Sequence, residues 1–227
     1  MSLEFRSKKE IVYDLLRDNI LKGKYKPGSR LVIDDLASKL NVSQIPIREA
    51  IRQLEADGFV TTEPYVGATV TQIDANFIYE VFALLESMEI IGSRSACRVM
   101  SDEQLETLVQ MTAEMDQVVT KPDEWSNQNK AFHLYICEIA QTDLVMKMMQ
   151  KVFDHWDRLR LHYLQDVSAN RILEAQDQHK QLLEAFIQCD PDEVERIIRE
   201  HNQRALQSYI QHLESEGHLV PTTDGGQ

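Results

Sequence analysis

The chain of 227 residues has only 8 glycines and 6 prolines, and aromatic residues make up 7% of it. So few turn-forming residues disfavour a protein built from many short strands, and the 43% of hydrophobic residues disfavour a disordered one. The composition instead predicts a mainly helical globular protein. Because the length exceeds that of one average domain, two compact domains are expected.

Long hydrophobic runs and cysteine pairs are also missing. No apolar segment approaches the roughly 20 residues needed to cross a bilayer, and the start MSLEFRSKKE lacks the apolar core of a secretory signal. Cys97, Cys137 and Cys189 are odd in number and form no CxxC pair, which favours reduced thiols over a disulfide framework. These features predict a cytoplasmic protein without membrane association, and they give the cysteines no chemical role.

Basic residues are scarce overall, but their distribution is uneven. The formal net charge is −13, which argues against wholesale coating of nucleic acid. Residues 1–70 hold 11 Lys and Arg against 10 Asp and Glu, whereas residues 71–227 hold 13 against 27. The two parts therefore carry +1 and −14, and this asymmetry indicates a division of labour between two domains.

The first 70 residues predict three helices followed by a hairpin. Hydrophobic residues recur at helical spacing in KKEIVYDLLRDNIL, which ends at Gly23, and in DDLASKL, where Asp34 is the expected N-cap. A third helix begins after Ser43 and ends at Gly58, and FVTTE and ATVT predict two strands joined by a tight turn. These elements predict a winged helix-turn-helix at residues 1–72.

The rest of the chain is helical in pattern and shows no strand-like alternation. Short connections force consecutive helices to be antiparallel neighbours, which predicts a helical bundle at residues 73–217. A loose tail is expected at residues 218–227, because LVPTTDGGQ has turn formers and no periodicity. The chain is thus predicted to be mainly all-α. The expected bundle helices are residues 75–99, 102–119, 122–141, 143–166, 169–189 and 191–215. The break between the fourth and fifth of these helices is placed at Ser168.

The third predicted helix, QIPIREAIRQLEA, has two distinct faces. Ile47, Ile51 and Leu54 form an apolar stripe that would seat the helix on its domain. Gln44, Arg48 and Arg52 recur every four residues on another face, where amide and guanidinium groups can pair with base edges. The alternative is an ordinary solvated amphipathic helix, which the helix alone does not exclude.

Histidines are the informative residues of the acidic part. Asn129 and His133 lie one helical turn apart, and His179 and His201 lie about equally far from the turn at residues 190–191. In an antiparallel hairpin these two imidazoles stand at equal height, so a third packed helix would bring four ligand-type side chains together. Neutral imidazoles commonly bind Zn or Ni. Taken singly, each histidine also fits a surface or hydrogen-bonded core position, and that interpretation alone applies to four others: His155, His162, His212 and His218.

The segment KPGSRLVIDDLASKLNVSQIPIREAIRQLEADGFV resembles the N-terminal domain of the GntR family of bacterial transcription regulators, in its PG turn, LA pair, VSxxPxREAxxxLEAxG core and wing glycine. The resemblance covers about residues 8–70 and implies that the second helix of the motif enters the major groove while the wing contacts the minor groove. The DNA contacts it implies are Ser43, Gln44, Arg48 and Gly67. The chain departs from the family at Gln44, Asp34 and Val66, where arginine or another basic residue is usual, so weak nonspecific binding with a shallow salt dependence is expected.

Residues 75–212 resemble the FCD effector-binding domain of the FadR-like subgroup, through NKAFH, QH at 178–179 and REH at 199–201. The resemblance implies a divalent metal site at Asn129, His133, His179 and His201. Asn129 replaces the usual Asp, which weakens the attraction for an ion without removing an oxygen ligand.

The same resemblance implies that a small organic acid binds inside the bundle, with the metal at one end and an arginine at the other. The candidate arginines are Arg94, Arg158 and Arg160. Phe82 stands where the subgroup often carries an arginine, so the ligand is expected to differ from the common hydroxy acids.

The leading hypothesis is a DNA-binding transcription regulator, most often a repressor in this family, that acts as a homodimer on a two-fold operator. Its operator affinity would respond to a small carboxylate effector, bound with a Zn- or Ni-type ion. The rival is a metal-dependent hydrolase, but Glu138 and Asp177 are poorly placed as general bases relative to the histidines. A nucleoid-type structural DNA binder fits the acidic bundle badly.

Overall fold

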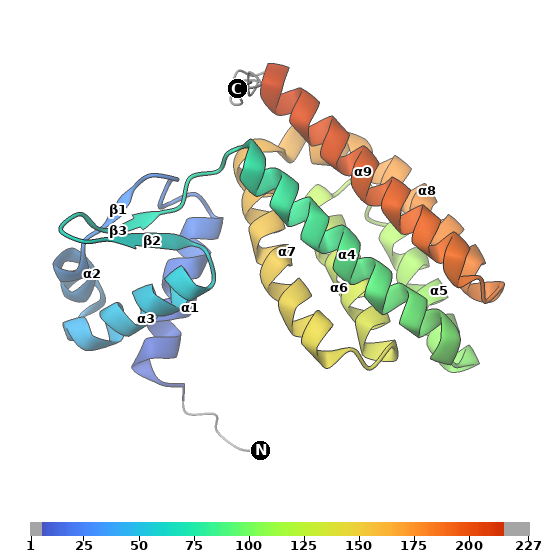
Figure 1. Ribbon diagram of the computed structural model, residues 1–227, viewed down its shortest axis with the longest axis horizontal. Helices are drawn as coiled ribbons and strands as arrows, with labels where there is room; N and C mark the ends of the chain where they lie inside the picture. The colour runs from blue at the N-terminus through green and yellow to red at the C-terminus, as the bar shows by residue number, and fades with distance from the viewer. Residues whose placement is uncertain (1–5, 216–227) are drawn as a thin grey trace, which may run out of the picture. The chain divides into compact units, whose positions relative to one another are not determined.

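The structure, a computed structural model, describes residues 6–215 of the chain (Figure 1). The chain divides into two compact units, with the first ending at Ile73 and the second beginning at Asp74. This division lies one residue from the predicted boundary, whereas the tail predicted at 218–227 lies outside the described residues. Among the described helices, none is both long and apolar enough to cross a membrane.

The first unit packs three helices against a small antiparallel sheet. Ser7 and Glu10 form a reciprocal capping box that starts the first helix. The strands are ordered β1-β3-β2, so the hairpin β2–β3 carries β1 on its far edge. Its core contains Leu16, Ile47 and Leu54, all with no exposed surface. The elements are α1 (Lys8–Leu21), β1 (Arg30–Leu31), α2 (Ile33–Leu40), α3 (Gln44–Ala56), β2 (Val60–Glu63) and β3 (Gly67–Val70).

Two local features of this unit differ from the sequence-based expectation. The predicted N-cap Asp34 is wrong, because α2 begins two residues earlier than that cap implies, with Val32 as N-cap and its carbonyl accepting from the amide of Leu36. The Asp34 carboxylate instead accepts a hydrogen bond from Gln44 on α3. The strand β1 was not expected, since a strand of two residues is too short to show alternation.

The described part of the second unit, up to residue 215, is a bundle of six helices. α4 lies beside α9 (Figure 1) and also packs on α6 and α7, and α8 packs on α5 and α9. Asp74 caps α4, and Ser101 forms a capping box with Gln104 at the start of α5. The helices are α4 (Ala75–Val99), α5 (Asp102–Asp116), α6 (Pro122–Ile139), α7 (Asp143–Tyr163), α8 (Gln165–Ile187) and α9 (Pro191–Ser215).

The predicted break at Ser168 is wrong, because α8 already begins at Gln165. The chain breaks at Leu164, whose φ of −126° and ψ of 16° are non-helical. Leu164 is nearly fully buried, and Ser168 donates its hydroxyl to the carbonyl of Gln165 inside the new helix. The segment Ser-Ala-Asn at residues 168–170 is thus no connection between helices but part of the second turn of α8.

Helices α4 and α6 approach closely at Gly92. A Cβ atom at this position would lie 2.8 Å from Sγ of Cys137, and that thiol is buried against Met149. The glycine thus lets the two helices pack at the level of the Cys137 side chain.

We predict that Gly92→Ala lowers stability by about 1–3 kcal/mol, the usual cost of overpacking a core. Helix propensity alone would favour the alanine by about 1 kcal/mol, so the sign of the change in melting temperature separates packing from propensity. Adding Cys137→Ala should reduce the effect of the first substitution, as measured in a double-mutant cycle. A higher melting temperature for Gly92→Ala would contradict the close approach.

Candidate functional site

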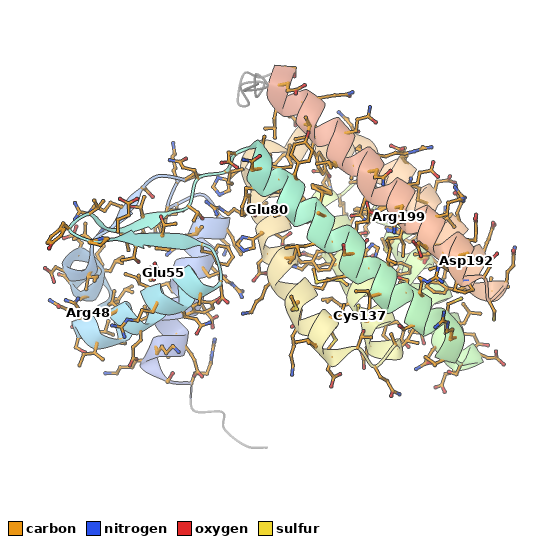
Figure 2. The ribbon with its side chains drawn as sticks, viewed as in Figure 1. Arg48, Glu55, Glu80, Cys137, Asp192 and Arg199 are labelled. Atoms are coloured by element: carbon orange, nitrogen blue, oxygen red, sulfur yellow. The ribbon has the colours of Figure 1, made fainter. Side chains whose placement is uncertain are left out.

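Helix α3 buries one face and exposes the other, as its pattern predicts. Ile47, Ile51 and Leu54 are buried in the core of the first unit. Arg48 (Figure 2) and Arg52 are exposed on the same helix. The helix is therefore held by its apolar stripe while its polar row remains free to contact a ligand.

The exposed row is organised by a chain of hydrogen bonds. Gln44 donates from Nε2 to Oδ1 of Asp34 over 2.5 Å, and its Oε1 accepts from Nη2 of Arg48 over 2.8 Å. The acceptor at Asp34 fixes which way the Gln44 amide points, and the amide oxygen in turn holds the guanidinium. Asp34 and Gln44 thus position Arg48, while other Arg48 donors remain free.

The remaining predicted contacts lie at the helix start and in the wing. Ser43 is the N-cap of α3, but its side chain makes no capping hydrogen bond. Gly67 has a φ of +97°, a left-handed conformation that favours glycine, and Arg30 lies 3.4 Å from where its Cβ would be. Tyr65 and Val66 are exposed in the turn before it.

The two glutamates of α3, Glu49 and Glu55, differ in their surroundings. Glu55 is held within the domain, because its Oε1 accepts from the amide of Thr62 over 2.9 Å. Glu49 is exposed, and the described part of the chain offers it no such partner. Its charge therefore stays on the surface of the helix.

The second unit brings the predicted histidines together. His133 on α6, His179 on α8 and His201 on α9 place one ring nitrogen each within 4.8 Å of the others. Asn129 lies one turn before His133, and its Oδ1 is buried without a hydrogen-bond partner. Both ring nitrogens of His133 and of His179 are likewise buried without partners.

Burial keeps these rings neutral at pH 7. Desolvation lowers the pKa of His133 to about 4 and holds the pKa of His179 well below its usual value. Desolvation also lowers the pKa of His201 to about 4, although part of that residue reaches the surface. Neutral imidazole carries a lone pair, so the three rings are in the form that binds a metal ion.

Acceptor oxygens lie beside two of the rings. Nδ1 of His201 lies 2.9 Å from Oε1 of Gln178, so this nitrogen carries the proton and Nε2 keeps the lone pair. Nδ1 of His133 lies 3.4 Å from Oε1 of Glu89, a contact slightly longer than a hydrogen bond. Burial raises the pKa of Glu89. Metal-binding histidines are commonly oriented by acceptors of this kind.

A cavity of about 50 Å³ adjoins His133 and His201, whereas His179 is not among its lining residues. Arg171 on α8 reaches it, donates from Nε to Glu174 over 3.3 Å, and has Nη2 buried without a partner. Aromatic side chains form much of the wall. The polar lining residues are Glu89, Ser126, Asn129, His133, Ser168, Arg171, His201, Asn202 and Tyr209, and the aromatic ones besides Tyr209 are Phe82, Trp125, Phe153 and Trp156.

The three arginines predicted to meet a ligand lie elsewhere. Arg94 donates to Asp192 and Glu195 at the start of α9, each over 2.7 Å (Figure 2 labels Asp192). Arg158 is fully buried over the ring of Phe77, and Arg160 pairs with Asp123 over 2.7 Å. None of the three is among the residues that line the cavity.

The cavity arginine, Arg171, was missed from the sequence. A signal existed, because Arg171, Ala175 and His179 recur at intervals of four along α8, and the first two line the cavity. The predicted helix began at residue 169, which put Arg171 in its first turn, whereas α8 begins at Gln165 and has Arg171 in its second turn. Glu89 and Gln178, which lie against His133 and His201, were missed as well.

An exposed row of amide and guanidinium groups on a winged helix-turn-helix, followed by a bundle with a polar interior, is typical of a DNA-binding transcription regulator. Residues 8–70 match the family model described as "Bacterial regulatory proteins, gntR family", and residues 80–204, more than half of the chain, match the "FCD domain" model. The chain belongs to the gntR family of bacterial regulatory proteins and carries an FCD domain.

Individual relatives agree with this assignment. The chain is 25% identical to the Nta operon transcriptional regulator of Aminobacter aminovorans, over 77% of this chain and 89% of that protein. It is 24% identical to the HTH-type transcriptional repressor GlaR of Escherichia coli, over 83% and 90% respectively. The solved structure of E. coli McbR/YncC shares the fold, with a TM-score of 0.72 and 20% identity over 91% of this chain and 99% of that one. The matched families and relatives are regulators, not enzymes, so the hydrolase hypothesis gains no support.

Proposed function

We propose that this regulator binds a two-fold DNA operator as a homodimer, and that a small organic acid held with a divalent metal ion inside the bundle controls this binding. The observation that carries the ligand half is the convergence of three neutral imidazoles and the unpartnered Asn129 oxygen beside a cavity that contains Arg171. Two Escherichia coli proteins that are similar to this chain, GlaR and RspR, are described as repressors, which supports repression as the mode of action.

The DNA half rests on the exposed face of α3. Arg48 and Arg52 can donate to guanine O6 and N7, and Gln44 orients Arg48. One short helix contacts too few base pairs to select a site in a genome, so two copies about one helical turn apart are required. Ser43 at the N-cap of α3 and Gly67 at the start of β3 would contact phosphates and so position the helix and the wing.

The residues fit a divalent ion of the Zn or Ni type. Leaving a buried polar atom without a partner costs about 1–3 kcal/mol, and Asn129, His133 and His179 each contain such an atom. The ligands would be Asn129, His133, His179 and His201, and the mixture of imidazole nitrogens with one oxygen suits these metals. When bound, the ion would offer a coordination position to a carboxylate oxygen.

Arg171 gives the effector its second anchor. Its buried Nη2 has donor capacity that the chain does not use, and guanidinium groups pair well with carboxylates. One water needs roughly 10–15 Å³ of such space, so a cavity of about 50 Å³ admits only a small molecule unless side chains move. The aromatic walls favour a short acid with an apolar body.

Effector control requires only that the acid binds two conformations of the dimer with different affinity. By linkage, operator DNA then changes the affinity for the acid by the same factor. A coupling of about 1–3 kcal/mol is typical and corresponds to a 5- to 150-fold change in operator affinity.

The first test selects operators from a pool of random DNA duplexes with the full-length protein. Recovery of an inverted repeat is expected, since each subunit reads one half-site. Arg48→Ala should then weaken binding by about 1–3 kcal/mol per half-site without lowering the melting temperature, because Arg48 is exposed. Arg98→Ala, an exposed arginine on α4, removes the same charge and should have little effect. A clear fall in the melting temperature of Arg48→Ala would make Arg48 a structural residue instead.

The hydrogen-bond chain yields a second prediction. Asp34→Ala removes a carboxylate that repels phosphate and also releases Gln44 and Arg48, so nonspecific affinity should rise while preference for the operator falls. Asp35→Ala, an exposed neighbour on α2, makes the same change of charge without touching Gln44. Affinities for operator and scrambled duplexes, measured over a range of salt concentrations, decide the matter. If both variants lost the same preference for the operator over scrambled DNA, the effect would come from the change of charge and not from the release of Gln44 and Arg48.

The metal part predicts that His179→Ala lowers the metal content of dialysed protein and the response to small carboxylates, while operator binding without effector persists. His212→Ala, on α9 and outside the cluster, is the matched control. Elemental analysis and a thermal-shift screen of carboxylic acids, with and without chelator, provide the measurements. An unchanged metal content in His179→Ala would contradict the proposed metal site.

A further inference from the structure

Glu89 is the one carboxylate among the residues that line the cavity. It lies on α4 with an exposed fraction of 4%. Its Oε2 accepts from Nδ2 of Asn202 over 2.7 Å, and its Oε1 lies 3.4 Å from Nδ1 of His133. Within residues 6–215 neither a lysine nor an arginine pairs with it, so the chain buries an acid without a permanent cationic partner.

Such an arrangement is costly without a compensating charge. A buried carboxylate is tolerated when it is paired with a cation or coordinates a metal. One hydrogen bond from the neutral amide of Asn202 satisfies a single oxygen and supplies no net charge. The uncompensated oxygen is the one that faces His133.

The predicted metal ligands have the complementary deficit. Three neutral imidazoles and the amide of Asn129 would surround a divalent ion without any negative charge. An ion with two positive charges in a bundle interior needs a nearby anion, because the Coulomb interaction is weakly screened there. Only the imidazole of His133 lies between Glu89 and the position expected for the ion.

We propose that Glu89 supplies the negative charge of the metal site: its Oε1 accepts from Nδ1–H of His133, which leaves Nε2 of that ring to bind the ion. This inference rests on the metal site of the proposed function and adds a residue that acts through His133. Glu89 is thus a positioning residue, in the carboxylate–histidine–metal arrangement that tunes many protein sites. Asn129 can stay neutral because the charge comes from α4.

Zinc affinity of the full-length protein, measured by competition with a chromophoric chelator, tests the assignment. Glu89→Gln keeps the shape and an acceptor for Asn202 but removes the charge, and the expected loss is 10- to 100-fold, the usual effect of altering such an outer partner. Adding Asn129→Asp restores a negative charge at the ion and should recover most of the affinity. Glu86→Gln, on the same helix, alters a carboxylate that pairs with Arg199 outside the cavity, and should stay within about twofold of the parent.

Melting temperatures provide a readout that a purely structural role would not give. In the presence of chelator, Glu89→Gln should melt no lower than the parent, because it removes a carboxyl group that the fold buries without a cationic partner. With zinc, it should gain less stability than the parent does. A variant less stable in both states, with no recovery on adding Asn129→Asp, would make Glu89 a packing residue and overturn the proposal.

Unchanged zinc affinity in Glu89→Gln would overturn it as well, while leaving the histidine site intact. If the parent itself takes up no zinc, the metal site fails, and the role of Glu89 fails with it. The parent measurement therefore separates failure of the proposed function from failure of this inference.

Discussion

The bundle interior contains polar groups whose hydrogen-bonding capacity is not satisfied by any residue between 6 and 215. Asn129, His133, His179 and Arg171 each bury at least one polar atom without a partner. At about 1–3 kcal/mol for each such atom, their combined cost is comparable to the whole free energy of unfolding of an ordinary domain, about 5–15 kcal/mol. In the proposed function, a metal ion and a small acid would supply partners for these atoms, so ligand binding would also stabilise the folded bundle.

The first domain has a net charge close to zero. It would therefore gain little binding free energy from neutralising DNA phosphates, and its proposed selectivity depends on how the side chains of α3 are oriented. Asp34 accepts a hydrogen bond from Gln44, and Gln44 accepts one from Arg48, which reduces the rotamer freedom of the guanidinium in advance of the base contact proposed for it. Orientation of this kind favours discrimination between sequences over affinity for DNA in general.

Much of the fold follows from the sequence because local signals agree with tertiary packing. The apolar stripe of α3 and the caps at Ser7, Asp74 and Ser101 give clear local signals. The histidine cluster was also predictable, since equal distance from a hairpin turn sets His179 and His201 at the same height. These inferences need only helical geometry and short connections.

The misses have a common cause, which is that side-chain partners across helices leave no local trace. Asp34 has the composition of an N-cap, but its partner is ten residues away on another helix. Arg94, Arg158 and Arg160 are indistinguishable from Arg171 by type, and only the rotation of each helix decides which faces the cavity. Glu89 could not be selected at all without knowing that α4 packs on α6 and α9.

The unsatisfied interior also bears on how a ligand signal could arise. A ligand that binds only the folded bundle at 100 times its dissociation constant stabilises it by about 2.7 kcal/mol, which lies within the range of known coupling energies. Joining His133 on α6, His179 on α8 and His201 on α9 through one bound ion would restrict the motion of the three helices that carry them. The energy for switching can therefore come from the polar interior itself, without a large displacement at the ligand site.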